Sequence, residues 1–422
     1  MAVAVATFLI ALAVIASERV HRTKVAMLGA AIVVLLVGES FDQEHAIEAI
    51  DFNTIGLLAG MMILVYITQQ TGIYDYIAVR AGQLSRGRPF LVVLYMAGTT
   101  ALLSAFLDNL TTILLVVPVT FLLADALDID PIPLVIIEVI ASNIGGTATL
   151  IGDPPNIIIA GATDLSFNAF IVNLAPAVVI TLAVVIGCLY LVFRSRLRVE
   201  ERNREAVMQL DARASIRDWD ELRRTVPVLL GTIIAFFAHQ TLHIEPATVA
   251  LTGAAIALLV TRLDLEEVLS GIEWPTLFFF LGLFVMVGAL EATGAIGEVA
   301  QAAEDLTGGD RTAELMGTIW IAGIGSAIVD NIPFTTAMIP VVAELQQGNG
   351  GDDAYWWALA LGTCFGGNAT IIAAAANVAA AGLAERAGRP IGFIRFLAVG
   401  VPVTLASLVI ATAYIAVRYI VL

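Results

Sequence analysis

Cysteine, lysine and charge are scarce in this chain. Its 422 residues include only 2 cysteines, Cys188 and Cys364, too far apart in sequence for a disulfide framework or a cysteine-rich metal site. Lys24 is the only lysine, and charged residues make up 14% of the chain, against about a quarter in soluble domains. Motifs of the forms G-x-x-x-x-G-K-[ST] and H-E-x-x-H are absent. We therefore predict a protein that is not an enzyme and needs neither a metal nor a cofactor.

Apolar residues dominate instead. Hydrophobic residues make up 59% of the chain, and the mean hydropathy is +0.91. Apolar runs of roughly 20 residues, enough to cross a bilayer, recur along the sequence. The first, 3–16, follows no basic segment, so we interpret it as a span and not as a cleaved signal. These runs predict a multi-pass protein of the plasma (inner) membrane, in contact with lipid. The net charge of −16 argues against nucleic acid as a partner.

The second half of the sequence repeats the first after about 222 residues. Three pairs of motifs match in the same order: 51–54 (DFNT) with 273–276 (EWPT), 104–109 (SAFLDN) with 326–331 (SAIVDN), and 145–149 (GGTAT) with 366–370 (GGNAT). Two copies of one long unit are typical of transporters, whereas a solenoid needs several short units. We predict a first repeat over 1–193, a cytoplasmic linker over 194–224 and a second repeat over 225–422.

We predict an all-α fold in which each repeat has five transmembrane spans, one of them broken, and a re-entrant hairpin. The segments of the first repeat are 3–17, 25–38, 53–70, the hairpin 89–125, the broken helix 131–163 and 174–193. Those of the second are 225–239, 247–261, 275–291, the hairpin 314–345, the broken helix 355–383 and 396–418. An odd number of crossings inverts the second repeat. Charge agrees, because only Arg311 and Arg418 among 21 basic residues then lie outside the cytoplasm.

The broken helices contain residues that cannot continue a helix. Residues 142–156 (SNIGGTATLIGDPPN) include three glycines and two consecutive prolines inside an apolar segment. Such a break leaves backbone amides and carbonyls unpaired, which a bilayer tolerates only where protein or a water-filled cavity satisfies them. We therefore expect the substrate or ion site where the two breaks and the two hairpin tips meet.

Carboxylates at membrane depth are the principal candidates for chemistry. Asp108, Asp153, Asp330 and Glu138 lie within apolar segments, where a charge costs at least about 2.5 kcal/mol. We expect Asp108 and Asp330 to border one cavity and, together with Glu138, to carry a coupling proton. Alternatives exist for each residue: Asp108 and Asp330 are suited to capping helices, Glu138 to bonding a neighbouring helix, and Asp153, whose counterpart is Ala374, to making a turn.

Neutral polar residues and glycines complete the predicted site. They are Asn109, Thr111, Thr112, Asn143, Gly145, Gly146, Thr147, Thr149 and Asn156 in the first repeat, and Asn331, Thr335, Gly366, Gly367, Asn368, Thr370 and Asn377 in the second. No lysine or arginine occurs in the tips or breaks, so we favour a cation, a proton or a neutral hydroxylic solute over a di- or tricarboxylate. Cys364 is a candidate ligand for arsenite, but a tight arsenite site needs three thiolates. We therefore favour a packing role for Cys364.

These motifs resemble a known family. SAFLDNLTTILLVVPVT, EVIASNIGGTATLIGDPPNIIIA, DNIPFTTAMIPVV and LALGTCFGGNATII are similar to the ArsB/NhaD group of the ion transporter superfamily, most closely to its P-protein-like branch. The resemblance implies an inverted-repeat fold, a scaffold, a mobile transport region with both hairpins, and a homodimer. Related dicarboxylate symporters carry Ser-Asn-Thr at the tips, where this chain has Asp-Asn, which argues against carboxylate transport.

The sequence therefore predicts a secondary transporter of a small inorganic solute or ion. We expect proton-coupled efflux of arsenite or antimonite by alternating access, with H⁺ or Na⁺ as the coupling ion. A sodium/proton antiporter and an anion-conducting channel of the P-protein type are the alternatives.

Overall fold

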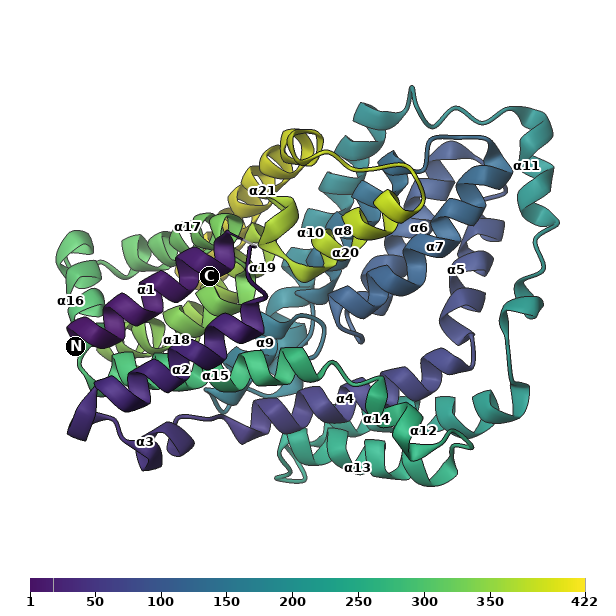
Figure 1. Ribbon diagram of the computed structural model, residues 1–422. Helices are drawn as coiled ribbons and strands as arrows, with labels where there is room; N and C mark the ends of the chain where they lie inside the picture. Colours follow the sequence, from purple (N-terminus) through teal and green to yellow (C-terminus); the bar gives the residue numbers. More distant parts are fainter. Residues whose placement is uncertain (18, 422) are drawn as a thin grey trace.

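Helices make up all the regular structure in the residues that the computed structural model describes, which are 1–17 and 19–421 (Figure 1). The first part of the chain forms α1 (Ala2–Ala16), α2 (Arg22–Leu36), η1 (Gly38–Ser40), α3 (Gln43–Glu48), α4 (Phe52–Gln70), α5 (Ile73–Leu84), α6 (Pro89–Ser104), α7 (Asn109–Leu127), α8 (Ile132–Gly146), α9 (Pro154–Gly161) and α10 (Phe167–Phe193).

The linker region forms α11 (Glu201–Met208) and the short η2 (Ala212–Ser215). The remaining elements are α12 (Trp219–Ala238), α13 (Pro246–Val260), α14 (Leu265–Ser270), α15 (Trp274–Ala292), α16 (Ala295–Thr307), α17 (Arg311–Ile328), α18 (Asn331–Gly348), α19 (Ala354–Gly366), η3 (Ile371–Ala373), α20 (Ala375–Arg386), α21 (Phe393–Ile415) and the π-helical η4 (Ala416–Val421). Helices α12 to α21 thus follow the same order as α1 to α10. The relative orientation of the two series in the membrane stays a prediction.

Several helices are suited to a membrane by length and composition. Helices α4, α7, α10 and α15 and the stretch Phe393–Val421 are each long and apolar enough to cross a bilayer. Helices α1, α6, α8 and α13 are apolar but shorter. This pattern agrees with a multi-pass membrane protein, while the predicted number of crossings remains untested.

Some predicted boundaries were wrong. Residues 80–84 and 302–307, which we placed in loops, belong to α5 and α16. Helix α12 begins at Trp219, inside the predicted linker, because the Asp218 side chain caps it by accepting from the amides of Asp220 and Glu221. Helix α10 begins at Phe167, where Ser166 caps it by accepting from the Ala169 amide. In each case the helix extends beyond the apolar run that we used to place it.

The helices pack in two groups. One group joins the two halves, with α2 along α15 and α13 along α4, and α1 and α12 beside them (Figure 1). Glycines permit these two crossings, because an added Cβ would lie 2.7 Å from the Ala250 backbone at Gly60 and 2.6 Å from the Ala26 backbone at Gly282. The other group holds the hairpins and broken helices, with α6 on α8, α17 on α19 and α7 on α20. The predicted site lies where α15, α18 and α9 bring the two groups together.

Candidate functional site

Two buried breaks form the centre of the site. Helix α8 ends at Gly146 and α9 begins at Pro154, while α19 ends at Gly366 and α20 begins at Ala375. The amide of Asn156 donates to the carbonyls of Thr147 and Thr149, at 3.0 and 2.8 Å. Asn377 does the same in the second half, donating to the carbonyls of Gly367 and Thr370 at 2.7 Å each. These asparagines therefore satisfy carbonyl groups that the breaks leave free.

Both hairpin tips converge on one carboxylate. Asn109 and Asn331, the first residues of α7 and α18, each donate from Nδ2 to the same oxygen, Oδ1 of Asp153, at 3.2 Å. Asp153 is fully buried. Its second oxygen, Oδ2, is also buried and has no hydrogen-bond partner among the described residues. A carboxylate with one unsatisfied buried oxygen is suited to binding a proton or a cation.

An asparagine network extends from this carboxylate across both halves. Asn109 also donates to Oδ1 of Asn143 at 3.2 Å. Asn143 in turn donates to Oδ1 of Asn368 at 3.1 Å and of Asn377 at 2.9 Å. The Nδ2 group of Asn368 is buried with no partner among the described residues. Four of the predicted asparagines are thus brought together in one buried network.

The predicted hydroxyl groups mostly bond to the backbone. Thr147, Thr335 and Thr370 donate to the carbonyls of Asn143, Asn331 and Ala327, at 2.9, 2.7 and 3.2 Å. The hydroxyl of Thr149 donates to the Ala105 carbonyl. Apart from Thr112, whose buried hydroxyl has no partner among the described residues, these groups hold the tips and breaks in place. The amide of Thr111 donates to Asp108, so this residue belongs to a helix cap.

The glycines of the breaks allow close backbone approach. An added Cβ at Gly145 would lie 2.5 Å from Cα of Ala101, and one at Gly366 would lie 2.8 Å from Cβ of Ser326. At Gly146 it would lie 2.7 Å from the Gly152 carbonyl oxygen. Gly367 is less crowded, with the nearest atom at 3.3 Å. These residues shape the site by packing and contribute no side chain to it.

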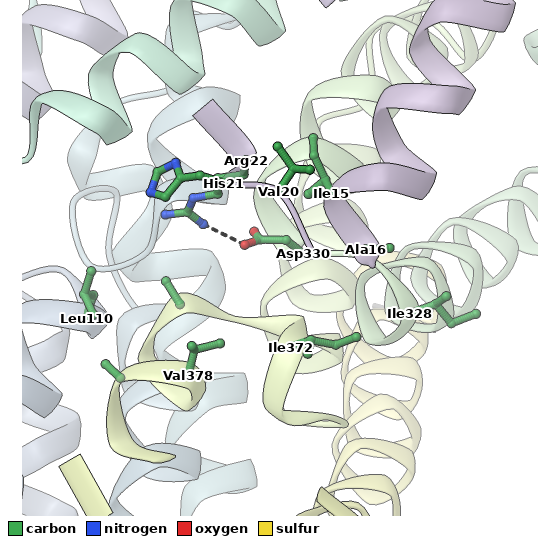
Figure 2. A pocket seen from close by; sticks show the side chains of 12 residues that line it. Ile15, Ala16, Val20, His21, Arg22, Leu110, Ile328, Asp330, Ile372 and Val378 are labelled. Atoms are coloured by element: carbon green, nitrogen blue, oxygen red, sulfur yellow. Dashed lines mark hydrogen bonds and ion pairs between the residues drawn. The ribbon is translucent and has the colours of Figure 1, made fainter. Parts of the chain in front are cut away.

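Asp330 forms an ion pair that the sequence did not predict. Its Oδ1 accepts from the Ile332 amide at 3.0 Å, as a helix cap, and its Oδ2 lies 2.7 Å from Nη1 of Arg22. Arg22 is the first residue of α2, and its guanidinium lies 5.2 Å from the centroid of the Phe279 ring. Figure 2 shows the Arg22 side chain pointing at Asp330. Tips and breaks hold no basic residue of their own, but the fold supplies one from another helix.

Two pockets flank Arg22. The larger, of about 450 Å³, is mostly apolar and is lined by residues that include His21, Arg22 and Asp330 (Figure 2). The smaller, of about 30 Å³, is lined by residues that include Arg22, Asp108 and Glu273. Asp330 lines the larger pocket and Asp108 the smaller one, while Arg22, Leu110 and Ala375 line both, so our expectation that the two aspartates border one cavity stays a prediction. Glu273 also belongs to the candidate site, although we did not predict it from the sequence. The match of Glu273 with Asp51 in the first pair of repeated motifs was a signal that could have found it.

Glu138 lies apart from the network. It is buried between α8 and α7, where Oε1 accepts from the Thr120 hydroxyl at 2.6 Å and Oε2 has no partner among the described residues.

Cys364 is fully buried, with Sγ 3.8 Å from Oδ1 of Asn156. No second cysteine accompanies it, because Cys188 is exposed on α10. Among the described residues, no cluster of three or more His, Cys, Asp or Glu could hold a metal.

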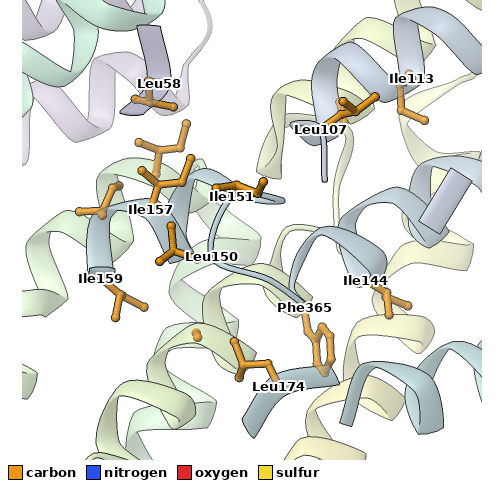
Figure 3. Close-up of a cluster of buried hydrophobic side chains, with 14 of the residues drawn as sticks. Leu58, Leu107, Ile113, Ile144, Leu150, Ile151, Ile157, Ile159, Leu174 and Phe365 are labelled. Carbon is orange, nitrogen blue, oxygen red and sulfur yellow. The ribbon is translucent and has the colours of Figure 1, made fainter. Parts of the chain in front are cut away.

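Apolar side chains enclose the break of the first half. Leu150, Ile151 and Ile157 surround it, and Phe365 packs nearby from α19 (Figure 3). Each of them is at most 3% exposed. A polar network inside such a shell is shielded from bulk water, which strengthens its electrostatic interactions. Two breaks, two tips and a buried polar centre in a set of membrane-crossing helices define a membrane transporter.

Comparison with known proteins agrees with this class. Residues 12–362 match the CitMHS family, described as citrate transporter. The chain is 46% identical to an uncharacterized transporter of Mycobacterium tuberculosis, over 100% of this chain and 99% of that protein. It is 34% identical to the P protein of Mus musculus, over 96% of this chain and 58% of that protein. The chain therefore belongs to the CitMHS citrate transporter family, with P proteins among its relatives.

A solved structure shares the fold. The crystal structure of the YdaH transporter of Alcanivorax borkumensis, whose topology is called unusual, matches with a TM-score of 0.61 at 16% identity, over 94% of this chain and 96% of that chain. Since the family is described as citrate transporter and the Mycobacterium tuberculosis relative is named a transporter, the chain is a multi-pass membrane transporter and not an enzyme, as the sequence predicts. The narrower ArsB/NhaD assignment stays a prediction.

Proposed function

We propose that this protein is a secondary active transporter in which Asp153 binds the coupling ion, H⁺ or Na⁺. The observation that carries the proposal is the Asp153 carboxylate, whose Oδ1 accepts from both hairpin tips while Oδ2 is buried without a partner among the described residues. Because one donor comes from each half, a movement of either tip changes the site. This arrangement suits alternating access by two inverted repeats.

Charge supports a cation, a proton or a neutral solute as cargo. Asp108, Asp153, Asp330 and Glu273 contribute four carboxylates around the tips, against the single cation of Arg22. A tricarboxylate such as the citrate of the family description would add negative charge to this set, at a high electrostatic cost inside the protein. In this proposal Asp108, Asp330 and Glu138 accept protons in transit to or from Asp153.

Two cargoes fit the polar centre. Arsenite and antimonite, as neutral hydroxylic solutes, can bond to the asparagine network, and Cys364 offers a single thiol beside it. Sodium is the second candidate, because carboxylate and amide oxygens are the ligands that hard cations prefer. The free oxygen of Asp153 and the amide oxygens of the neighbouring asparagines support sodium/proton exchange as the alternative to arsenite efflux.

Reconstituted vesicles test the proposal. The wild-type protein with a trapped pH indicator is given an inward or outward proton gradient and, in turn, Na⁺, Li⁺, arsenite, antimonite or citrate. We expect saturable, proton-coupled flux with at least one cation or neutral solute, and none in Asp153→Asn. Asp164→Asn, which changes an exposed aspartate in the connection after α9, is the matched control. Coupled flux that survives in Asp153→Asn would refute the role of this carboxylate, and coupled flux of citrate alone would refute the cargo class.

A further inference from the structure

A basic pocket lies away from the central site, where the linker meets the first half of the chain. Its volume is about 460 Å³, and its lining residues include Arg80, Arg86, Arg88, Tyr95 and Met208. Arg80 belongs to α5, Arg86 and Arg88 to the turn before α6, Tyr95 to α6 and Met208 to α11. Helices α5, α6 and α11 lie at one side of the molecule (Figure 1).

Among the described residues no carboxylate lines this basic pocket, and Asp211 lies in a neighbouring pocket that Arg80 also lines. The structure pairs none of its three guanidinium groups with a carboxylate among the residues that it describes, and Arg80 donates only to Gln83 at 2.8 Å. Two arginines elsewhere in the chain do have partners: Nη2 of Arg389 lies 3.2 Å from Oδ1 of Asp125, and Nη2 of Arg395 lies 3.4 Å from Oδ2 of Asp130. Three converging positive charges without a protein partner indicate a site for an anion.

The turn that carries two of these arginines is fixed. Arg86 and Gly87 have φ values of 50° and 63°, in the left-handed region that glycine and asparagine adopt more readily than arginine. An added Cβ at Gly87 would lie 2.8 Å from Cα of Arg204, so α11 packs directly on this turn. An arginine held in a conformation that costs it energy points to a role for its side chain.

An apolar stripe continues from the basic pocket along α6. Leu91, Tyr95, Gly98 and Leu102 recur at helical spacing on one face, and Leu102 is 63% exposed. An added Cβ at Gly98 would meet no atom within 4 Å, so the stripe is open at its centre. Helix α6 is one of the apolar helices of the fold. A bound molecule that joins an anionic group to a long apolar chain would match both features.

We propose that the basic pocket binds the headgroup of an anionic phospholipid, with an acyl chain along the α6 stripe. Basic pockets at the membrane surface recognise such headgroups. The corresponding segment of the second half, 302–312, which runs from the end of α16 to the start of α17, carries Glu304, Asp305 and Asp310, and its Arg311 is paired with Asp352. The lipid site therefore occurs once per chain, and a bound lipid fastens α11 of the linker to α5 and α6.

Native mass spectrometry of the full chain in detergent tests this site. Wild-type protein is titrated with phosphatidylglycerol and with phosphatidylcholine of the same chains, and Arg86→Gln/Arg88→Gln is compared with Arg223→Gln/Arg224→Gln. The control removes the same charge from two exposed arginines of α12. We expect wild type to prefer phosphatidylglycerol, the pocket variant to bind it about tenfold more weakly or worse, and the control to match wild type. Equal losses in both variants, or no preference for phosphatidylglycerol, would overturn the site.

A second variant separates a lipid from a free phosphate. Gly98→Phe fills the open part of the stripe without touching the arginines, and its folding is checked by gel filtration. We expect it to weaken phosphatidylglycerol binding several-fold, and we expect inorganic phosphate at millimolar concentration not to displace the lipid from wild type. If inorganic phosphate displaces the lipid and Gly98→Phe binds it normally, the pocket is a phosphate site and the lipid assignment is wrong.

Discussion

The two hairpin tips carry the same Asp-Asn pair, but the fold surrounds them differently. Asp108 and Asp330 each cap the helix that follows, by accepting from a backbone amide at 2.8 and 3.0 Å. Asp330 is also paired with Arg22, whereas Asp108 shares its small pocket with Glu273. Arg22 begins α2, and the helix in the corresponding place, α13, begins with Pro246. The same local sequence therefore gives both tips the same helix cap, and residues outside the tips place different charges beside them.

The largest effect should follow from removing either tip carboxylate. Asp108→Asn and Asp330→Asn keep a residue that caps helices well but delete a proton site. We expect each variant to insert and purify normally and to lose at least about tenfold of its pH-gradient-driven flux in vesicles, as expected for a general acid or base. Only Asp330→Asn should also lower the thermal midpoint, because it leaves Arg22 without its partner. Normal pH dependence in both variants would reduce these aspartates to helix caps.

Breaking the ion pair from the other side comes next. Arg22→Gln leaves the Asp330 carboxylate, only 9% exposed, without a cation. We expect a loss of about 3 kcal/mol in unfolding free energy, as for other buried pairs that lose one partner. Thermal unfolding of both single variants and of Arg22→Gln/Asp330→Asn measures the coupling, and the double variant should lose less than the sum. Additive losses would show that the pair contributes nothing. Arg22→Gln/Asp164→Asn, which combines Arg22 with an exposed aspartate after α9, is the control in which additivity is expected.

Much of this asymmetry could not be predicted from the sequence. Apolar length, glycines and prolines are local signals, so the broken segments and the asparagines that satisfy them could be predicted. Arg22 and Asp330 are 308 residues apart, and no periodicity links them. Asp153 resembled a turn residue because its counterpart is Ala374, and its place between Asn109 and Asn331 depends on how both tips dock.

The smallest effect should appear at both tips and be at least as large at Asn109, whose amide also donates to Asn143. Asn109 and Asn331 each donate to Oδ1 of Asp153 at 3.2 Å, so both side-chain amides bond to the same carboxylate oxygen. We expect Asn109→Ala and Asn331→Ala each to weaken the apparent affinity for the coupling ion by about tenfold, since a hydrogen bond to a charged group contributes about 1.5 kcal/mol or more. Flux measured against ion concentration gives both values. Asn173→Ala, on α10, is a control in which no change of affinity is expected. A loss of affinity at one tip only would contradict the shared oxygen.

Cross-linking the two tips tests the central claim, that both close over one carboxylate. Asn109→Cys and Asn331→Cys are introduced together into protein with Cys188→Ala and Cys364→Ala, and a short bifunctional thiol reagent is added. We predict that the halves stay joined after proteolysis at the linker arginines, and that they separate once a cleavable cross-link is broken. Arg389→Cys with Asp125→Cys is the positive control, because the native side chains form an ion pair on the surface, with Nη2 of Arg389 3.2 Å from Oδ1 of Asp125. Halves that separate while this control stays joined would contradict the account.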